Sequence, residues 1–169
     1  MIYDVNGNPI ASGGGGVPDF LTGKRYIAMG DSIVATQGSN NAIVYYTGTD
    51  LQGNTYDNVE MRGYIRDIED RYGVVATAYG DSGGYIQRNY AKRCCLDYSS
   101  VALVTIAFGT NDAHYSHALG TVDSLDSESY AGCLNHLVQK ILMDNPECRI
   151  IICTPPQRLT VNNFGSWTP

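Results

Sequence analysis

The segment VALVTIAF, at residues 101–108, is almost entirely apolar and shows no regular alternation of apolar with polar side chains. A continuous run of this kind fits a strand that is covered on both faces, as in parallel sheets flanked by helices. Three other short apolar segments lie within 24–32, 74–79 and 146–156. The chain is therefore expected to contain a parallel sheet built from these four strands.

Segments with helical spacing separate the expected strands. Apolar side chains within 57–73 share one helical face, and Gly73 is a typical helix stop. A second long helix is expected over about 127–145, and a short one over 85–95. Strands that alternate with helices predict an α/β fold with three α/β/α layers and a parallel, doubly wound, flavodoxin-like sheet.

The remaining segments define the domain. Residues 1–23 contain the turn signal NGNP and the run SGGGGVP, which predict a flexible N-terminal arm or linker. Residues 24–169 are expected to form one domain, because 169 residues suffice for a single sizeable core. Within it, the polar segment 36–55, rich in Gly and Asn, is expected to be a surface loop.

Charge and hydropathy exclude two classes of partner. Lys and Arg total 11 against 17 Asp and Glu, a net charge of −6, and the basic residues are scattered, so nucleic acid is not expected to bind. The apolar runs are far shorter than the roughly 20 residues that span a bilayer. The first ten residues lack the basic and apolar regions of a secretion signal, and no compartment is predicted.

The five cysteines, Cys94, Cys95, Cys133, Cys148 and Cys153, are odd in number and form no C-x-x-C pair. Such spacing does not favour a structural zinc site or a disulfide framework. They are expected to be reduced and mostly buried, with Cys153 inside an apolar strand.

A polar turn follows each of the first three expected strands: GDS at 30–32, GDSGG at 80–84 and GTND at 109–112. In open parallel sheets, ligands bind beyond the carboxyl ends of the strands. The three turns therefore predict a binding or catalytic site at that edge of the sheet.

Ser82 lies in a G-x-S-x-G pattern, which is typical of the strand-to-helix turn that exposes the nucleophile of α/β-hydrolases. The turn also looks like the nucleophile loop of chymotrypsin-like proteases, but their general base precedes the serine, whereas the first histidine here is His114. An α/β-hydrolase order of Ser, acid and His stays open as an alternative with His114, His117 or His136 as the base.

The three turns together resemble the blocks of the SGNH, or GDSL-type, hydrolase family. MGDSI at 29–33 is similar to its first block, AYGDSGGYI at 78–86 to its second and FGTND at 108–112 to its third. The resemblance covers residues 24–156.

The resemblance implies a serine esterase that needs no cofactor. Ser32 would be the nucleophile, and the N–H groups of Ser32 and Gly83 with the side-chain amide of Asn111 would form the oxyanion hole. Gly80 and Gly84 remain alternatives to Gly83.

Two aspartates in these turns receive supporting roles, and the remaining serine and the three histidines receive non-catalytic interpretations. Asp31 and Asp112 are interpreted as hydrogen-bonding supports of the turns rather than as catalysts. His114 and His117 could share a helical face with Asp112 and bind a metal, but we interpret them as surface or pocket-rim residues and expect no metal site. His136 is expected to be structural or partly exposed, and Ser82 to be a turn residue.

The general base of the family is a histidine in a D-x-x-H block near its C-terminus. The residues three before each histidine here are Asn111, His114 and Cys133, so the block is absent. We therefore expect an N-terminal portion of a longer protein, nearly inactive by itself because serine is a weak nucleophile without a base. His114 or His117 as a substitute base is the alternative. A truncated sheet would also expose an edge and favour self-association.

The substrate is only coarsely indicated. The resemblance implies an ester or thioester of a short acyl chain, with removal of carbohydrate O-acetyl groups as one common role. The alternative from a different class is a non-catalytic carbohydrate-binding, phage-tail or cell-surface module on the same fold.

Overall fold

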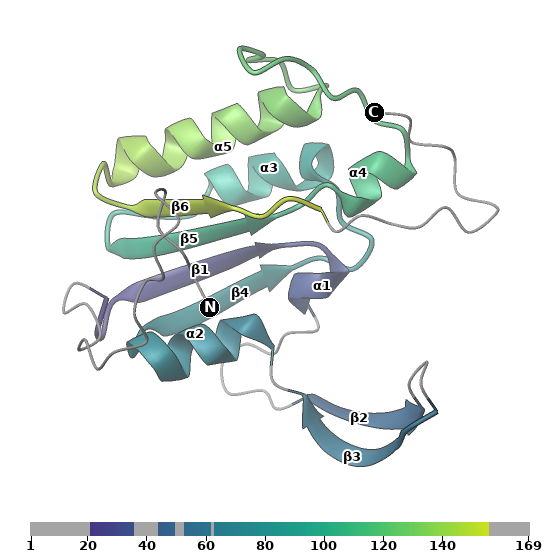
Figure 1. Cartoon of the computed structure of the whole chain (residues 1–169). Helices are drawn as coiled ribbons and strands as arrows, with labels where there is room; N and C mark the ends of the chain where they lie inside the picture. Colours follow the sequence, from purple (N-terminus) through teal and green to yellow (C-terminus); the bar gives the residue numbers. More distant parts are fainter. Residues whose placement is uncertain (1–20, 36–43, 50–52, 62, 156–169) are drawn as a thin grey trace, which may run out of the picture.

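A parallel sheet forms the centre of the molecule in a computed structural model that describes residues 21–35, 44–49, 53–61 and 63–155. Its strands lie in the order β4 (Val75–Gly80), β1 (Arg25–Gly30), β5 (Val101–Ala107) and β6 (Arg149–Ile152), and every neighbouring pair is parallel. All four strands expected from the sequence are present, so the predicted α/β class is confirmed (Figure 1). Residues 1–20 of the expected arm lie outside the described residues.

Helices cover both faces of the sheet. Helix α2 (Tyr64–Tyr72) lies on one face, and α3 (Ile86–Cys94) and α5 (Tyr130–Asp144) lie together on the other (Figure 1). Along β1, Tyr26 and Ala28 pack in the core on the α2 side, whereas the alternate residues Ile27 and Met29 pack on the α3 and α5 side. Because both faces are covered, successive residues of the strand must all be apolar, which explains its continuous apolar run.

Capping residues define the beginning of α5 and the end of α2. Ser129 caps α5 by accepting a hydrogen bond from the Gly132 N–H (3.1 Å), and the helix begins at Tyr130. Gly73 ends α2 in the left-handed conformation, with φ of 62°, and its N–H donates to the Glu69 carbonyl. The expected helix over 85–95 is present as α3.

Two expectations for the segment before α2 are wrong. Residues 55–61 form a strand, β3 (Thr55–Met61), rather than the start of a helix, and within the expected loop residues 44–49 form β2 (Val44–Thr49). The two strands pair with each other in an antiparallel ribbon outside the main sheet. Aromatic and β-branched residues favour strands, but pairing with a distant partner decides such short segments.

The carboxyl ends of β1, β4 and β5 lie level with one another. Gly30 at the end of β1 is in register with Gly80 of β4 and Ala107 of β5. The short helices α1 (Ser32–Ala35) and α4 (Thr110–His114) begin just beyond this edge. The expectation that the three polar turns meet at one edge of the sheet is therefore confirmed (Figure 1).

Several chemical features of the described residues bear on function. None of the described helices is long and apolar enough to cross a membrane. The five cysteines are free: Cys133 and Cys148 are buried, Cys94 and Cys153 are half-buried, and Cys95 is exposed. Strand β6 ends at Ile152, so Cys153 lies just beyond the strand in which it was expected.

Candidate active site

The first turn presents Ser32 as the first residue of α1, separated from the end of β1 by Asp31 alone. Asp31 is buried, and its Oδ1 accepts a hydrogen bond from the Ile33 N–H (2.9 Å), which fixes the start of the helix. Gly30 has no room for a side chain, because a Cβ would come within 2.5 Å of the Ala107 carbonyl oxygen. Ser32 is half-buried, and its hydroxyl has no hydrogen-bond partner in the part of the chain that the structure describes.

The second turn is joined to the first through the backbone. The Asp81 N–H donates to the Gly30 carbonyl (3.0 Å), and the Gly84 N–H closes the turn on the Asp81 carbonyl (2.7 Å). Gly83 has a positive φ of 69°, and no atom lies within 4 Å of the position that its Cβ would take. Gly83 therefore borders open space, whereas the N–H of Gly84 is already used within the turn.

Ser82 lies in the same turn but on its exposed side. The neighbouring Asp81 carboxylate points into the fold, where its Oδ2 accepts a hydrogen bond from Asn89 Nδ2 (3.1 Å). Asn89 also donates to the Tyr85 carbonyl (3.0 Å) and so holds the turn against α3. The second turn is thus supported from the helix side, while Ser82 faces outward.

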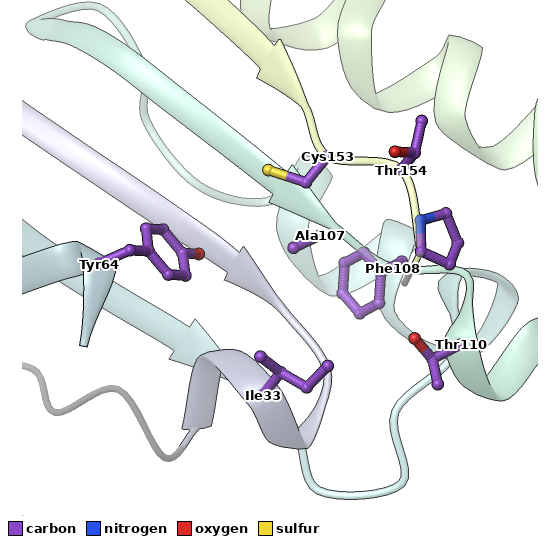
Figure 2. Close-up of a pocket in the computed structure, with 8 residues that line it drawn as sticks. Ile33, Tyr64, Ala107, Phe108, Thr110, Cys153 and Thr154 are labelled. Carbon is purple, nitrogen blue, oxygen red and sulfur yellow. The ribbon is translucent and has the colours of Figure 1, made fainter. Parts of the chain in front are cut away.

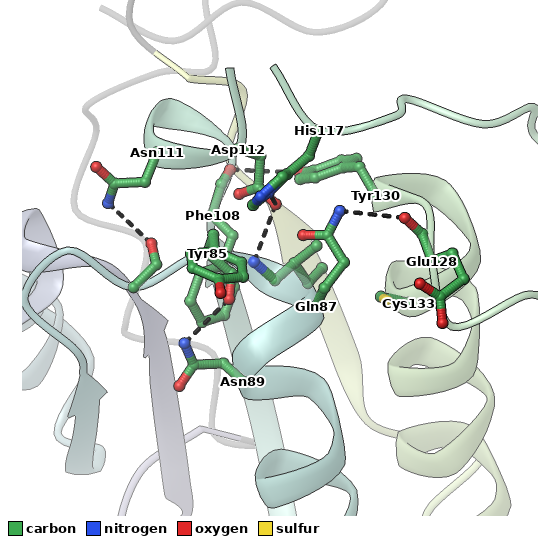
Figure 3. A network of polar contacts seen from close by, with 12 residues as sticks. Tyr85, Gln87, Asn89, Phe108, Asn111, Asp112, His117, Glu128, Tyr130 and Cys133 are labelled. Atoms are coloured by element: carbon green, nitrogen blue, oxygen red, sulfur yellow. Dashed lines mark hydrogen bonds and ion pairs between the residues drawn. The ribbon is translucent and has the colours of Figure 1, made fainter. Parts of the chain in front are cut away.

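The third turn is joined to the second by two side chains of α4. Asn111 Nδ2 donates to the Gly84 carbonyl (2.8 Å), and Asp112 Oδ1 accepts from the Ile86 N–H at the start of α3 (3.0 Å), as Figure 3 shows. Asp112 is buried. The three turns that carry Ser32, Gly83 and Asn111 therefore form one hydrogen-bonded unit at the sheet edge.

Solved structures share this arrangement of strands and helices at low sequence identity. A possible lipase from Chitinophaga pinensis matches with a TM-score of 0.61 and 19% identity, over 80% of this chain and 49% of that protein. A Bacteroides uniformis protein named for its likeness to GDSL lipases matches with a TM-score of 0.57 and 16% identity, over 82% and 74%. The chain has the fold of the SGNH/GDSL hydrolases.

This likeness concerns the fold alone, because the identities are below 20%. Phospholipase A1 from Streptomyces albidoflavus also matches, with a TM-score of 0.52 and 17% identity over 84% of this chain and 64% of that enzyme. The chain spans about half the length of the C. pinensis protein. Neither a protein-family model nor a curated protein matches the sequence.

Within this SGNH/GDSL fold, Asp112 is paired with a histidine that lies close by. His117 Nδ1 is 3.8 Å from Asp112 Oδ1, and the His117 ring meets the Tyr85 ring edge-on, with centroids 4.5 Å apart (Figure 3). Burial raises the pKa of Asp112, while the hydrogen bond from Ile86 and the nearby His117 act in the opposite direction. The expected supporting role of Asp112 thus has a physical basis in its bond to α3.

The other two histidines lie elsewhere. His114 is exposed at the end of α4, with its ring beside that of Tyr115. His136 on α5 is half-buried, and its Nε2 lies 2.8 Å from the Leu125 carbonyl oxygen. No histidine of the described residues contacts the Ser32 hydroxyl. The same residues contain no group of three or more His, Cys, Asp or Glu arranged to hold a metal ion.

A pocket of about 260 Å³ lies beside the first and third turns (Figure 2). Sequence reasoning missed it, although three of its residues lie within the motif blocks: Ile33 in MGDSI, and Phe108 and Thr110 in FGTND. Tyr64 and Cys153 also line it, but they are far from every motif in the sequence. Only the fold brings these two residues to the site, so no local pattern could have identified them.

Proposed function

We propose that this protein hydrolyses carboxylic esters with Ser32 as the nucleophile, in the manner of SGNH/GDSL-type hydrolases. The observation that carries the proposal is the pair of hydrogen bonds that joins the three turns, from the Asp81 N–H to the Gly30 carbonyl and from Asn111 Nδ2 to the Gly84 carbonyl. These bonds support a common site for Ser32, Gly83 and Asn111. The SGNH/GDSL fold gives independent support.

The proposed oxyanion hole follows from the donors that these turns leave available. Attack by Ser32 Oγ on an ester carbonyl places negative charge on the carbonyl oxygen, and each fixed donor aimed at that charge stabilises the transition state by about 3–4 kcal/mol. The backbone N–H groups of Ser32 and Gly83 are two candidates. The Asn111 amide carries two hydrogens, so one remains after the bond to Gly84.

Among the alternatives for the glycine donor, Gly84 is disfavoured because its N–H donates to the Asp81 carbonyl. Gly83 is favoured by the open space on its Cβ side, where a substrate could approach the backbone closely. Gly80 stays a second candidate. We keep Asp31 and Asp112 as supports, because each accepts a backbone N–H and so fixes a turn.

The proton of Ser32 needs a base for fast turnover, and its hydroxyl has no partner among the described residues. We therefore expect the 169-residue chain to hydrolyse even activated esters slowly. If His114 or His117 acts as a substitute base, a double change of both to alanine will lower this residual rate. We expect the rate to be unchanged, because His117 faces Asp112 and Tyr85.

The test is hydrolysis of p-nitrophenyl acetate by the longest form of the protein that can be produced, compared with Ser32→Ala and its matched control Ser82→Ala. We expect Ser32→Ala to lower the rate by at least about 100-fold and Ser82→Ala to leave it unchanged. Loss only in Ser82→Ala would instead favour an α/β-hydrolase mechanism. Absence of hydrolysis in every form would favour a non-catalytic module that binds carbohydrate or assembles in a phage tail or cell surface.

A further inference from the structure

The pocket beside the first and third turns combines motif residues with segments that lie outside the motifs. Ala107 and Phe108 line it from the end of β5, and Tyr64 lines it from the start of α2 (Figure 2). The segment after β6, residues 153–155, also lines it. The pocket therefore brings together residues next to Ser32 and Asn111 in the sequence with residues from α2, the end of β5 and the segment after β6.

The wall after β6 is held firmly in place. The Cys153 N–H donates to the Ile106 carbonyl (2.8 Å), which continues the pairing of β5 with β6 beyond the last strand residue. Pro155 packs so closely on Gly109 that a Cβ at Gly109 would overlap the proline ring. Gly109 also has a φ of 124°, which favours glycine. One wall of the pocket is thus fixed by backbone pairing and by close packing.

No described residue that lines the pocket carries a formal charge: Ile33, Tyr64, Ala107, Phe108, Thr110, Cys153, Thr154 and Pro155. Burial raises the pKa of both the Tyr64 hydroxyl and the Cys153 thiol, so both groups are neutral near pH 7. The two threonine hydroxyls are the remaining polar side-chain groups. A polar ligand such as a sugar would lose more hydrogen bonds with water than this lining can replace.

From this lining and position we infer that the pocket binds the acyl chain of the substrate, and that the acyl group is an unbranched alkyl chain of several carbons. The inference rests on the proposed ester hydrolysis. An ester held at Ser32 has an acyl side and an alcohol side, and an apolar chain gains free energy for each methylene that it buries in such a pocket.

The order of bond changes assigns the pocket to the acyl side. Ser32 Oγ forms a bond to the carbonyl carbon while the bond from that carbon to the alcohol oxygen breaks, and the serine proton leaves with the alcohol. Water then attacks the same carbon, which releases the carboxylic acid and restores Ser32. The alcohol must depart before water enters, whereas the acyl chain can stay bound in the pocket throughout both steps.

The first measurement compares two series of esters. In one, p-nitrophenyl esters keep the same alcohol while the acyl chain lengthens from acetyl to decanoyl; in the other, acetate esters keep the acyl group while an n-alkyl alcohol lengthens. We expect kcat/KM to rise about fourfold per methylene in the first series until the pocket is filled. We expect little change in the second series, and a rise confined to it would overturn the inference.

The second measurement separates this inference from the proposed catalysis. Sodium alkanoates from acetate to decanoate are titrated into Ser32→Ala, and binding is followed by calorimetry. We expect the affinity to rise by the same factor per methylene, since binding needs no nucleophile. A rising affinity without hydrolysis by the unmodified protein would leave the inference standing and reject the catalysis. If the unmodified protein hydrolyses acetyl esters but the affinity for alkanoates does not rise with chain length, the proposed catalysis would stand and the acyl pocket would be rejected.

Variants at Cys153 test whether this pocket is the one occupied. Cys153→Phe should fill it and lower binding of decanoate at least tenfold while leaving acetate unaffected, and Cys153→Ala should leave decanoate binding intact or improve it. Cys95→Phe is the matched control, because Cys95 is exposed at the end of α3 and does not line the pocket. Equal effects of Cys153→Phe on acetate and decanoate, in a variant with an unchanged melting temperature, would contradict the assignment.

Discussion

The tripeptide Gly-Asp-Ser occurs at the ends of two neighbouring parallel strands, yet the two copies have different surroundings. Gly30 and Gly80 are in register, so the copies begin at equivalent places in the sheet. In the first, Asp31 is buried and Ser32 starts a helix. In the second, Asp81 is half-exposed and Ser82 is fully exposed in a turn.

The residues that follow each copy explain the difference. Ile33 and Val34 continue the first copy as a helix, and Val34 is buried in the core. Two glycines follow the second copy, and Gly83 takes a positive φ that ends any helix at that point. The comparison teaches that three letters do not define a nucleophile. The first copy adjoins the pocket through Ile33, which is a further reason for proposing Ser32 rather than Ser82 as the nucleophile.

The largest expected effect is on kcat, and it distinguishes two asparagine side chains that lie near the carboxyl edge of the sheet. Asn111→Ala should lower kcat for p-nitrophenyl acetate by about 100- to 1000-fold, because it removes a proposed oxyanion donor. Asn89→Ala is the control: Asn89 is buried and bonds Asp81 and Tyr85 on the helix side of the second turn. It should lower the melting temperature but change kcat by less than about threefold. Similar losses of kcat in both variants would assign Asn111 a purely structural role.

The second prediction compares two glycines of the second copy. A Cβ at Gly80 would overlap the backbone of Ala35 on α1, whereas a Cβ at Gly83 would meet no atom within 4 Å. Gly80→Ala should therefore lower the free energy of unfolding by about 3 kcal/mol, since backbone must move to make room. Gly83→Ala should cost about 1 kcal/mol, from its positive φ alone. Urea unfolding of both variants measures this, and equal costs would refute the close packing of α1 on β4.

The third prediction compares the two aspartates of the copies. Asp31→Ala should lower the free energy of unfolding by about 1–2 kcal/mol, because it removes a buried acceptor for the Ile33 N–H. Asp81→Ala should cost less, about 0.5 kcal/mol, since Asp81 is half-exposed and Asn89 keeps its bond to Tyr85. Thermal unfolding under identical conditions compares them. A larger loss of stability in Asp81→Ala than in Asp31→Ala would show that the second turn depends more on its aspartate than the first turn does, contrary to our expectation.

The sequence predicted the parts of the fold that have local signatures. Continuous apolar runs identified all four strands of the sheet, and Gly73 identified the end of α2. The β2 and β3 ribbon was missed because each strand is specified by its partner rather than by its own pattern. Val59 happened to fall at helical spacing from Ile65, which suggested a helix that begins too early.

The candidate site likewise has residues that a local sequence pattern predicts and residues that only the fold brings together. Ser32, Gly83 and Asn111 were predicted because each lies in the turn after a strand, parallel strands end at one edge, and the three turns resemble the SGNH/GDSL blocks. The pocket was not predicted, since Tyr64 and Cys153 reach it from α2 and from the segment after β6. The contact of His117 with Asp112 also depends on the turn after α4 folding back, because the His117 N–H donates to the Asp112 carbonyl (3.0 Å).

The smallest expected effect concerns Asp112, which ties the third turn to the second but not to the first. Burial raises its pKa above 3.8, so the folded state favours the protonated carboxyl. The stability from this group is fully present below pH 3.8 and is lost as the pH rises through the raised pKa.

In Asp112→Asn, the amide oxygen can still accept the Ile86 N–H, while the amide nitrogen can face His117 Nδ1. The melting temperature of this variant relative to the unmodified protein should therefore increase modestly from pH 4 to pH 8. Asp112→Ala is the control and should be less stable at every pH, because the Ile86 N–H loses its acceptor. A difference between Asp112→Asn and the unmodified protein that stays constant with pH would show that Asp112 is ionised as readily in the fold as in the unfolded chain.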